Sequence, residues 1–172
     1  MTKIGLREIT IDGCIAYVSL SRGMTSVIDL ADIDKVAAWN WYATKSKIGG
    51  LTYAARNQMN NGKLAIVLMH RIIAETPDGM ETDHIDGDGL NNRNKNLRHA
   101  SKSQNMHNSK KPHNNTSGFK GVHWHNGKRK WQANIKVNNK RQYLGQFDDI
   151  GLAVMAYSMA SKKLHLDFSR LL

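Results

Sequence analysis

A carboxylate and an imidazole stand side by side at Asp83 and His84, and two asparagines, Asn96 and Asn105, follow farther along the chain. Carboxylate and amide oxygens are the hard ligands that Mg²⁺ or Mn²⁺ prefers. A histidine can take the proton from an attacking water at neutral pH. Together these groups could hydrolyse a phosphodiester bond, which needs charge stabilisation and an activated nucleophile. A single Asp–His pair is more often structural, so the elements around the four residues must decide.

The segments around these residues predict a small ββα unit. Gly87 and Gly89 permit a tight loop directly after the Asp–His pair. Ser101 and Gln104 have the spacing of a capping box, so a helix is expected to begin there. Asn105 would lie in the first turns of that helix and face back toward the loop. The spacing therefore favours a catalytic site over a chance pair.

The segment resembles the HNH nuclease family, and more closely its branch of phage homing endonucleases. The resemblance implies that His84 is the general base and that Asp83 binds the metal ion. It also implies that Asn96 fixes the hairpin and orients the histidine, and that Asn105 is the second metal ligand. One Mg²⁺ or Mn²⁺ per chain is expected. Three neighbouring positions that fit the family are expected to contact DNA: His70, Arg71 and Arg98.

The chain is strongly basic, with a formal net charge of +11 and a pI near 9.9. This indicates an anionic partner, and nucleic acid is favoured over a membrane because there is no basic amphipathic helix. The excess of basic over acidic side chains is spread unevenly along the chain. Residues 113–172 carry ten basic against three acidic side chains, residues 66–112 seven against six, and residues 1–65 eight against five. Catalysis and DNA affinity are therefore expected to lie in different parts of the chain.

The single cysteine, Cys14, excludes an internal disulfide and a cysteine-based zinc site, so no zinc is expected. Cys14 is expected to be a small apolar core residue in a reducing compartment. No apolar run approaches the length of a membrane span, and no targeting segment is recognised. These features predict an intracellular protein, and the resemblance to phage homing endonucleases implies a phage-encoded protein in the cytoplasm of a bacterial host cell.

Residues 1–65 are expected to form a β-rich segment that braces the nuclease unit at residues 66–109. A short helix is predicted from Asp32 to about Trp39, and another from about Met69 to before Pro77. The sequence Asn60–Asn61–Gly62 predicts a hairpin turn. Strands are predicted at Cys14–Leu20, Ser26–Leu30, Trp41–Thr44, Thr52–Arg56 and Lys63–Leu68.

A polar linker is predicted at residues 110–118, and residues 119–172 then show a different pattern. Trp131, Ala133 and Ile135 alternate with polar residues, and apolar residues alternate with polar ones in the segments before and after as well. This pattern predicts a three-stranded antiparallel sheet with one apolar and one basic face. Turns are expected at Asn126–Gly127 and Asn138–Asn139. A final helix, capped by Asp148 or Asp149, would place its alanine-rich stripe against the sheet.

Residues 116–172 resemble the DNA-binding domain of plant ethylene-response-factor proteins, in segments such as Gly118–Val122 and Tyr143–Asp148. The resemblance implies that the open sheet face lies in the DNA major groove. The plant domains have other residues at several contact positions, so their base preference is not transferable. The positions that match the family's DNA contacts are Lys120, His123, His125, Asn134, Lys136, Arg141 and Tyr143.

Taken together, the sequence predicts an α+β protein that is a metal-dependent endonuclease of double-stranded DNA, of a nicking or homing type. Its catalytic residues would be His84 and Asn96, and its metal ligands Asp83 and Asn105. One site per chain fits a monomer on DNA that nicks one strand, whereas a dimer could cut both. The alternatives are a sequence-specific DNA-binding regulator with a vestigial HNH unit, and a structural or RNA-binding protein that uses the basic face.

Overall fold

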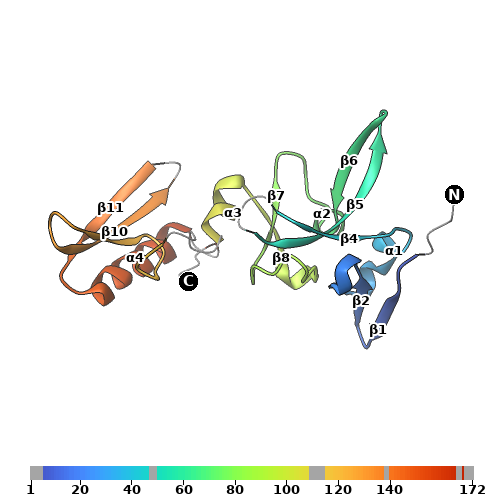
Figure 1. Ribbon diagram of the computed structural model, residues 1–172, viewed down its shortest axis with the longest axis horizontal. Coiled ribbons are helices and arrows are strands. Elements are labelled where there is room, and N and C mark those ends of the chain that lie inside the picture. The colour runs from blue at the N-terminus through green and yellow to red at the C-terminus, as the bar shows by residue number, and fades with distance from the viewer. Residues whose placement is uncertain (1–5, 47–49, 109–114, 138–139, 166–167, 169–172) are drawn as a thin grey trace. The chain divides into compact units, whose positions relative to one another are not determined.

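The computed structural model describes residues 6–46, 50–108, 115–137, 140–165 and 168 (Figure 1). The chain is α+β, as expected, with small antiparallel sheets and few helices. It divides into two units, residues 1–101 and 102–172. The finer division into a bracing segment, nuclease unit, linker and sheet domain stays a prediction. Most of the linker and the Asn138–Asn139 turn lie outside the described residues.

The first sheet is an antiparallel meander near the N-terminus. Its strands are β1 (Ile9–Asp12), β2 (Ile15–Ser19) and β3 (Thr25–Asp29), in that order. Strand β1 was not predicted, because it is only four residues long and three of them are exposed. The expectation for Cys14 was wrong, since its side chain is exposed beside the turn that joins β1 to β2.

Two short 3-10 turns and a short helix complete this part of the chain. They are η1 (Ser21–Gly23), η2 (Leu30–Asp32) and α1 (Ile33–Val36). Helix α1 is shorter than predicted: it ends at Val36, and Trp39 lies beyond it with its side chain half exposed. The core beneath these elements includes Ile28, Val36, Trp41 and Met69, each at most 1% exposed, and the indole nitrogen of Trp41 donates to the Val36 carbonyl at 2.9 Å.

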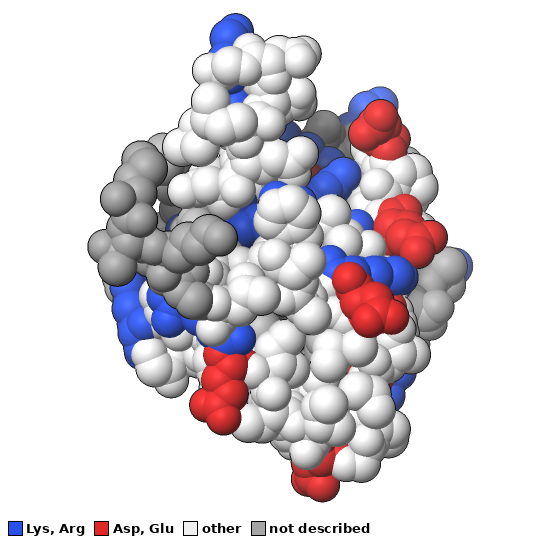
Figure 2. Space-filling view, turned by 90° about the vertical axis from the view of Figure 1, so that its right-hand side faces the viewer, with Lys and Arg blue, Asp and Glu red and all other residues white. Residues whose placement is uncertain are grey.

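The second sheet consists of β4 (Tyr42–Lys45), β5 (Thr52–Asn60) and β6 (Lys63–Leu68), in the order β4-β5-β6. The predicted turn between β5 and β6 is confirmed, with positive φ at Asn61 and Gly62. The far end of this hairpin carries exposed apolar side chains, and Figure 2 shows it as an uncharged projection with a basic tip. Elsewhere on that face, basic and acidic side chains are interspersed, so this face is not a uniformly basic surface.

The Asp83–His84 segment follows in the same unit. Its elements are α2 (Met69–Ile73), β7 (Glu81–His84), η3 (Asn94–Asn96) and β8 (Leu97–Ala100). Strands β7 and β8 pair in antiparallel fashion, and α2 packs against β5, β6 and β7. The two strands are held in place by the N-terminal sheets, because α2 contributes Met69 and Ile73 to the shared core.

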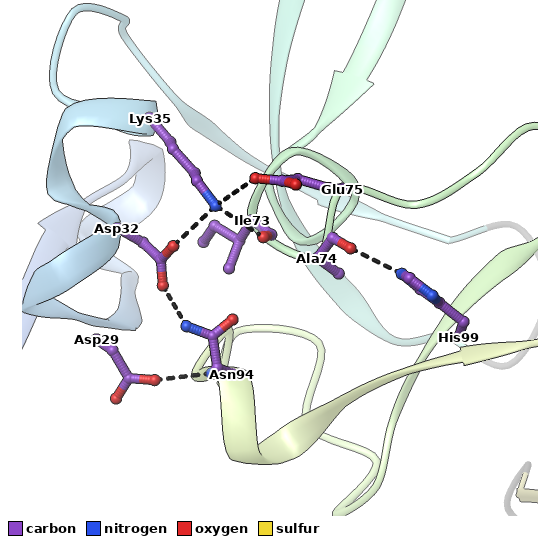
Figure 3. Close-up of polar contacts among 8 residues, drawn as sticks. All are labelled: Asp29, Asp32, Lys35, Ile73, Ala74, Glu75, Asn94 and His99. Atoms are coloured by element: carbon purple, nitrogen blue, oxygen red, sulfur yellow. Dashed lines mark hydrogen bonds and ion pairs between the residues drawn. The ribbon is translucent and has the colours of Figure 1, made fainter.

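Polar contacts also join β3 and its following turn to the loop before β8 (Figure 3). Asp29 accepts from Arg93 Nε at 2.9 Å and from the Asn94 backbone at 2.8 Å. Burial alone would raise the pKa of Asp29, but the hydrogen bonds from Arg93 and Asn94 outweigh it, so the pKa is lowered. Asp32 accepts from the Asn94 side-chain amide. These contacts are consistent with a bracing role for the N-terminal segment.

Replacing Asp32 with alanine is expected to lower the free energy of unfolding by about 1–3 kcal/mol, because it removes the hydrogen bond that the buried, charged carboxylate of Asp32 accepts from the Asn94 side chain. Asp32 is 4% exposed and also pairs with Lys35 at 3.1 Å. Glu75, which pairs with the same lysine at 2.9 Å, is the matched control. Its side chain is exposed, so Glu75→Ala should leave stability unchanged. Urea denaturation measures the free energy of unfolding of both variants. An equal loss in Asp32→Ala and Glu75→Ala would contradict the prediction.

The second unit contains a helix, a sheet and a longer helix. Its elements are α3 (Lys102–Asn108), β9 (Val122–His125), β10 (Lys130–Val137), β11 (Lys140–Phe147) and α4 (Ile150–His165). The sheet order is β11-β10-β9, and α4 packs on one face. This confirms the predicted three strands. The predicted alternation of burial holds along β10, whereas in β11 four exposed residues precede four half-buried ones. The shared core is Val122, Ala133, Ile135, Ala153 and Tyr157.

Local contacts explain how closely α4 approaches the sheet. Asp149 Oδ1 accepts from the Leu152 backbone at 3.1 Å, which identifies Asp149 as the helix cap. Gly121 has φ +73°, and a Cβ there would lie 2.1 Å from the Tyr157 ring. Only glycine therefore fits beneath α4 at this point. Trp124 packs edge-on against Trp131, yet it remains 41% exposed and so is only partly a core residue.

Candidate active site

Strand β7 places Asp83 and His84 in the interior, at 3% and 4% exposure. Asp83 lies opposite Arg98 on β8, and His84 lies opposite Leu97. Arg98 Nε donates to Asp83 Oδ2 at 2.8 Å, and Nη2 makes an ion-pair contact with the same oxygen at 2.7 Å. Arg98, which was expected to contact DNA, is thus bonded to the predicted metal ligand. Its contact with DNA stays a prediction.

The loop after His84 is cross-linked by Asn96, which is 6% exposed. The Asn96 side chain accepts from the Asp86 backbone at 3.0 Å and donates to Asp86 Oδ1 at 2.9 Å and to the Asn91 carbonyl at 2.7 Å. Burial alone would raise the pKa of Asp86, but the hydrogen bonds that its carboxylate accepts outweigh it and lower the pKa. These bonds are what a residue that fixes the hairpin would make. Its catalytic role stays a prediction.

The loop also lies very close to β5. A Cβ at Gly89 would approach the Thr52 carbonyl to 2.3 Å and the Tyr53 ring to 2.6 Å. Glycine is therefore required here for close approach to the backbone, whereas Gly87 serves the turn through its φ of +72°. The expectation of a tight, glycine-dependent loop is confirmed. Through Gly89 the loop is fixed to the second sheet.

Three rings surround the proposed base. His84 lies 4.9 Å from His70 and 5.8 Å from Tyr53, measured between ring centroids. His84 Nε2 lies 2.9 Å from Asn92 Oδ1. Burial lowers the pKa of His84, although the bond to Asn92 and the carboxylates of Asp86 and Asp83 act in the opposite direction. At neutral pH the ring is therefore uncharged and able to accept a proton.

The donor set of this site suits a hard cation that keeps most of its water. Among the described residues, no three His, Cys, Asp or Glu side chains gather closely enough to hold a metal ion. Mg²⁺ commonly takes one or two protein oxygens together with water and substrate phosphate, so Asp83 with one further oxygen would suffice. Because Arg98 binds Oδ2 of Asp83, a cation would take Oδ1 or displace the arginine. Asn105 lies half-buried in α3, in the second unit, so its pairing with Asp83 stays a prediction.

His70 is buried at 5% exposure on α2. Its Nδ1 has no hydrogen-bond partner among the described residues. Burial lowers the pKa of His70 to about 3, with smaller contributions from His84 and Arg71. The ring is therefore neutral at physiological pH, and a phosphate contact would need a hydrogen bond rather than a positive charge. Arg71, half-buried, donates to the Met80 carbonyl at 2.9 Å. The expected DNA contacts of both residues stay predictions.

The buried neutral state of His70 predicts a pH dependence of stability. Because the folded-state pKa lies below the ordinary value of 6.5, its contribution is present above pH 6.5 and is lost as the pH falls toward 3. The free energy of unfolding should fall by up to about 1.4 kcal/mol per pH unit from this residue. In His70→Gln that component should disappear. Urea denaturation between pH 7 and 4.5 measures it, and parallel curves for both proteins would contradict the assignment.

The open face of the C-terminal sheet brings together most of the residues that were expected to contact DNA. Lys136 lies directly opposite Arg141, and Asn134 directly opposite Tyr143. His123 is exposed on the neighbouring strand β9, on the face away from the α4 core. Like charges placed opposite each other repel across a sheet, and the DNA contacts of Lys136 and Arg141 stay predictions. His125, half-buried, follows His123 at alternate spacing, and Lys120 lies before β9.

Sequence reasoning missed three residues of the site. Asn92 and Ser26, both 0% exposed, are linked to His84 through hydrogen bonds, and Tyr53 packs against its ring. Asn92 stands in the asparagine-rich loop, but nothing in the sequence separates it from Asn91. Ser26 and Tyr53 lie far from His84 in sequence, and no local pattern marks them.

Comparisons with known proteins agree with this geometry. A family model described as HNH endonuclease matches residues 67–107, which include α2, β7, β8 and most of α3. The site thus lies in an HNH endonuclease domain, which suggests a nuclease that acts on DNA. The chain is also 34% identical to Protein 3.8 of Escherichia phage T7 over 94 residues, which cover 55% of this chain and 77% of that protein. The chain belongs to the family of that phage protein.

No solved structure matches the chain. Among the described residues, no helix is both long and apolar enough to cross a membrane. The phage relative fits the expected phage origin.

Proposed function

We propose that this protein is a metal-dependent endonuclease of double-stranded DNA, with His84 as the general base. The observation that carries the proposal is the buried, uncharged His84 beside the carboxylate of Asp83, in a segment similar to HNH endonucleases. HNH nucleases generally use a divalent metal. Bound Mg²⁺ or Mn²⁺ would supply charge neutralisation at the phosphate and the departing oxygen.

The chain's own residues would divide the remaining work. His84 would take the proton from the attacking water, and Asp83 with Asn105 would hold the cation. Arg98 would keep the Asp83 carboxylate in place through its bond to Oδ2. Asn96 would keep the loop closed through its bonds to Asp86 and Asn91. This division agrees with the burial of Asp83, His84 and Asn96.

The basic sheet of the second unit would supply DNA affinity. Major-groove docking through the open face of β9, β10 and β11 is part of the proposal, supported by the exposed Lys136, Arg141, Tyr143 and His123. One catalytic site per chain suits nicking by a monomer, and a dimer would allow cleavage of both strands. A homing role in the cytoplasm of a bacterial host is part of the proposal, and the phage relative supports a phage origin.

A supercoiled-plasmid assay tests the proposal. The full chain with Mg²⁺ or Mn²⁺ should convert supercoiled DNA to the nicked form, and EDTA should prevent this. Cleavage that is unchanged in EDTA would contradict metal dependence. Binding without nicking in either metal would favour a DNA-binding regulator, a function consistent with an Asp83 that already pairs with Arg98. Tighter binding to duplex RNA would contradict major-groove docking, because the RNA major groove is deep and narrow.

A further inference from the structure

A continuous line of hydrogen bonds runs from the first sheet to the proposed general base. His84 Nε2 lies 2.9 Å from Asn92 Oδ1, and Asn92 Nδ2 donates to Ser26 Oγ at 2.7 Å. Ser26 Oγ in turn donates to the Leu90 carbonyl at 3.1 Å, and Met69 Sδ lies 3.4 Å from the same hydroxyl. Ser26 and Asn92 are both fully buried.

The acceptors at the far end of this line of hydrogen bonds determine which atom donates and which accepts in each bond. Met69 Sδ can only accept and lies 3.6 Å from Asn92 Nδ2, so the Asn92 amide turns its NH₂ and not its oxygen toward the thioether and the neighbouring serine, and the Ser26 hydroxyl donates to the Leu90 carbonyl or to the sulfur. Ser26 Oγ must then accept from Asn92, which requires the amide NH₂ to face the serine. The amide oxygen of Asn92 therefore faces His84. An amide oxygen cannot donate, so His84 Nε2 must carry the hydrogen.

We infer that Ser26 and Asn92 are positioning residues that fix His84 in its Nε2–H tautomer, which leaves the lone pair on Nδ1. The catalytic consequence rests on the proposed function, whereas the tautomer itself does not. A buried imidazole without this line could carry its hydrogen on either nitrogen, and only one tautomer presents the basic atom at a given place. The first sheet would thus set which atom of the general base takes the proton.

Backbone pairing explains why Ser26 reaches this position. Val27, its neighbour on β3, donates to the Leu90 carbonyl at 2.9 Å and accepts from the Asn92 backbone at 2.7 Å. The loop after His84 is therefore joined to β3 on both sides of residue 91, with a parallel bridge between Val27 and Asn91. This pairing holds Ser26 beside the Asn92 side chain without a flexible connection. The N-terminal segment braces the loop and also orients its histidine.

The tautomer can be measured directly in the full chain labelled with ¹⁵N-histidine, by long-range ¹H–¹⁵N correlation at pH 8, where the His84 ring is neutral. The wild-type His84 should show the Nε2–H pattern alone. In Ser26→Ala the Asn92 amide keeps only its weak contact with Met69 Sδ at 3.6 Å, and in Asn92→Leu the acceptor is gone. Both variants should therefore show a mixture of tautomers at His84. His99 is exposed on β8 and is not part of the line, so its signals serve as an internal control.

The possible outcomes separate this inference from the proposed function, because the spectrum needs neither DNA nor metal. An Nδ1–H pattern in the wild type would overturn the inference, and so would a pure Nε2–H pattern in Ser26→Ala. If Asn92→Leu does not fold, the spectra of the wild type and of Ser26→Ala still test the inference. Where the wild type nicks DNA, Asn92→Leu should lower kcat about 10- to 100-fold with little change in KM, as expected for the loss of an orienting partner.

Discussion

Replacing His84 with alanine should lower the rate of metal-dependent plasmid nicking by roughly 10²- to 10⁴-fold, the usual contribution of a positioned general base. The reason is local. His84 is buried at 4% exposure, burial lowers its pKa, and the ring therefore remains uncharged and ready to accept a proton at neutral pH. No other histidine of the site can replace it, because His70 is held neutral by a pKa of about 3 and is a very weak base.

The assay needs a control that separates chemistry from folding and binding. His99→Ala removes the same side chain from the neighbouring strand, where the ring is exposed and bonds only the Ala74 carbonyl at 2.7 Å among the described contacts. It should nick at nearly the wild-type rate. His84→Ala should still bind duplex DNA, since the basic sheet lies in the other unit. Equal nicking by wild type and His84→Ala would remove His84 from the mechanism.

The sequence predicted elements well wherever a local rule decides them. The alternation of Trp131, Ala133 and Ile135 specified the central strand of the C-terminal sheet, because period-two burial is a property of consecutive residues. Likewise Asn61–Gly62 specified a hairpin through their tolerance of positive φ. The Asp83–His84 pair was correctly placed on a strand end followed by a glycine-rich loop.

The remaining features depend on contacts between residues distant in sequence. His70 is buried against the rings of Tyr53 on β5 and His84 on β7. The partnership of Ser26 with Asn92 arises only when β3 pairs with the loop after His84. Arg98 is expected to contact DNA because its position fits the family, and that contact stays a prediction. Its ion pair with Asp83 depends on the register of β7 with β8 and was not foreseen. Edge strand β1 has only two apolar residues, Ile9 and Ile11, and of these only Ile9 packs against the core, so its alternation is too short to mark it.

Neutralising the cross-strand pair Lys136 and Arg141 to glutamine should weaken binding to duplex DNA roughly tenfold or more and reduce the salt dependence of binding by about two counterions. Both side chains are exposed on the face that α4 leaves open. Electrophoretic mobility shift or fluorescence anisotropy over a range of salt concentrations measures both quantities. The control is Lys162→Gln with Lys163→Gln, which removes the same charge from exposed positions on α4, the helix that covers the other face.

The free energy of unfolding of the Lys136 and Arg141 double variant distinguishes the loss of a DNA contact from a loss of folding. Two like charges directly opposite each other on antiparallel strands repel, so removing them should leave the free energy of unfolding unchanged or raise it by a few tenths of a kcal/mol. A fall in affinity without a fall in stability, which the Lys162 and Lys163 control does not share, identifies a surface that uses those charges on a ligand. Equal loss of affinity in the Lys162 and Lys163 control would instead mean that net charge alone holds the DNA. In that case the open face of β9, β10 and β11 would not be the docking surface.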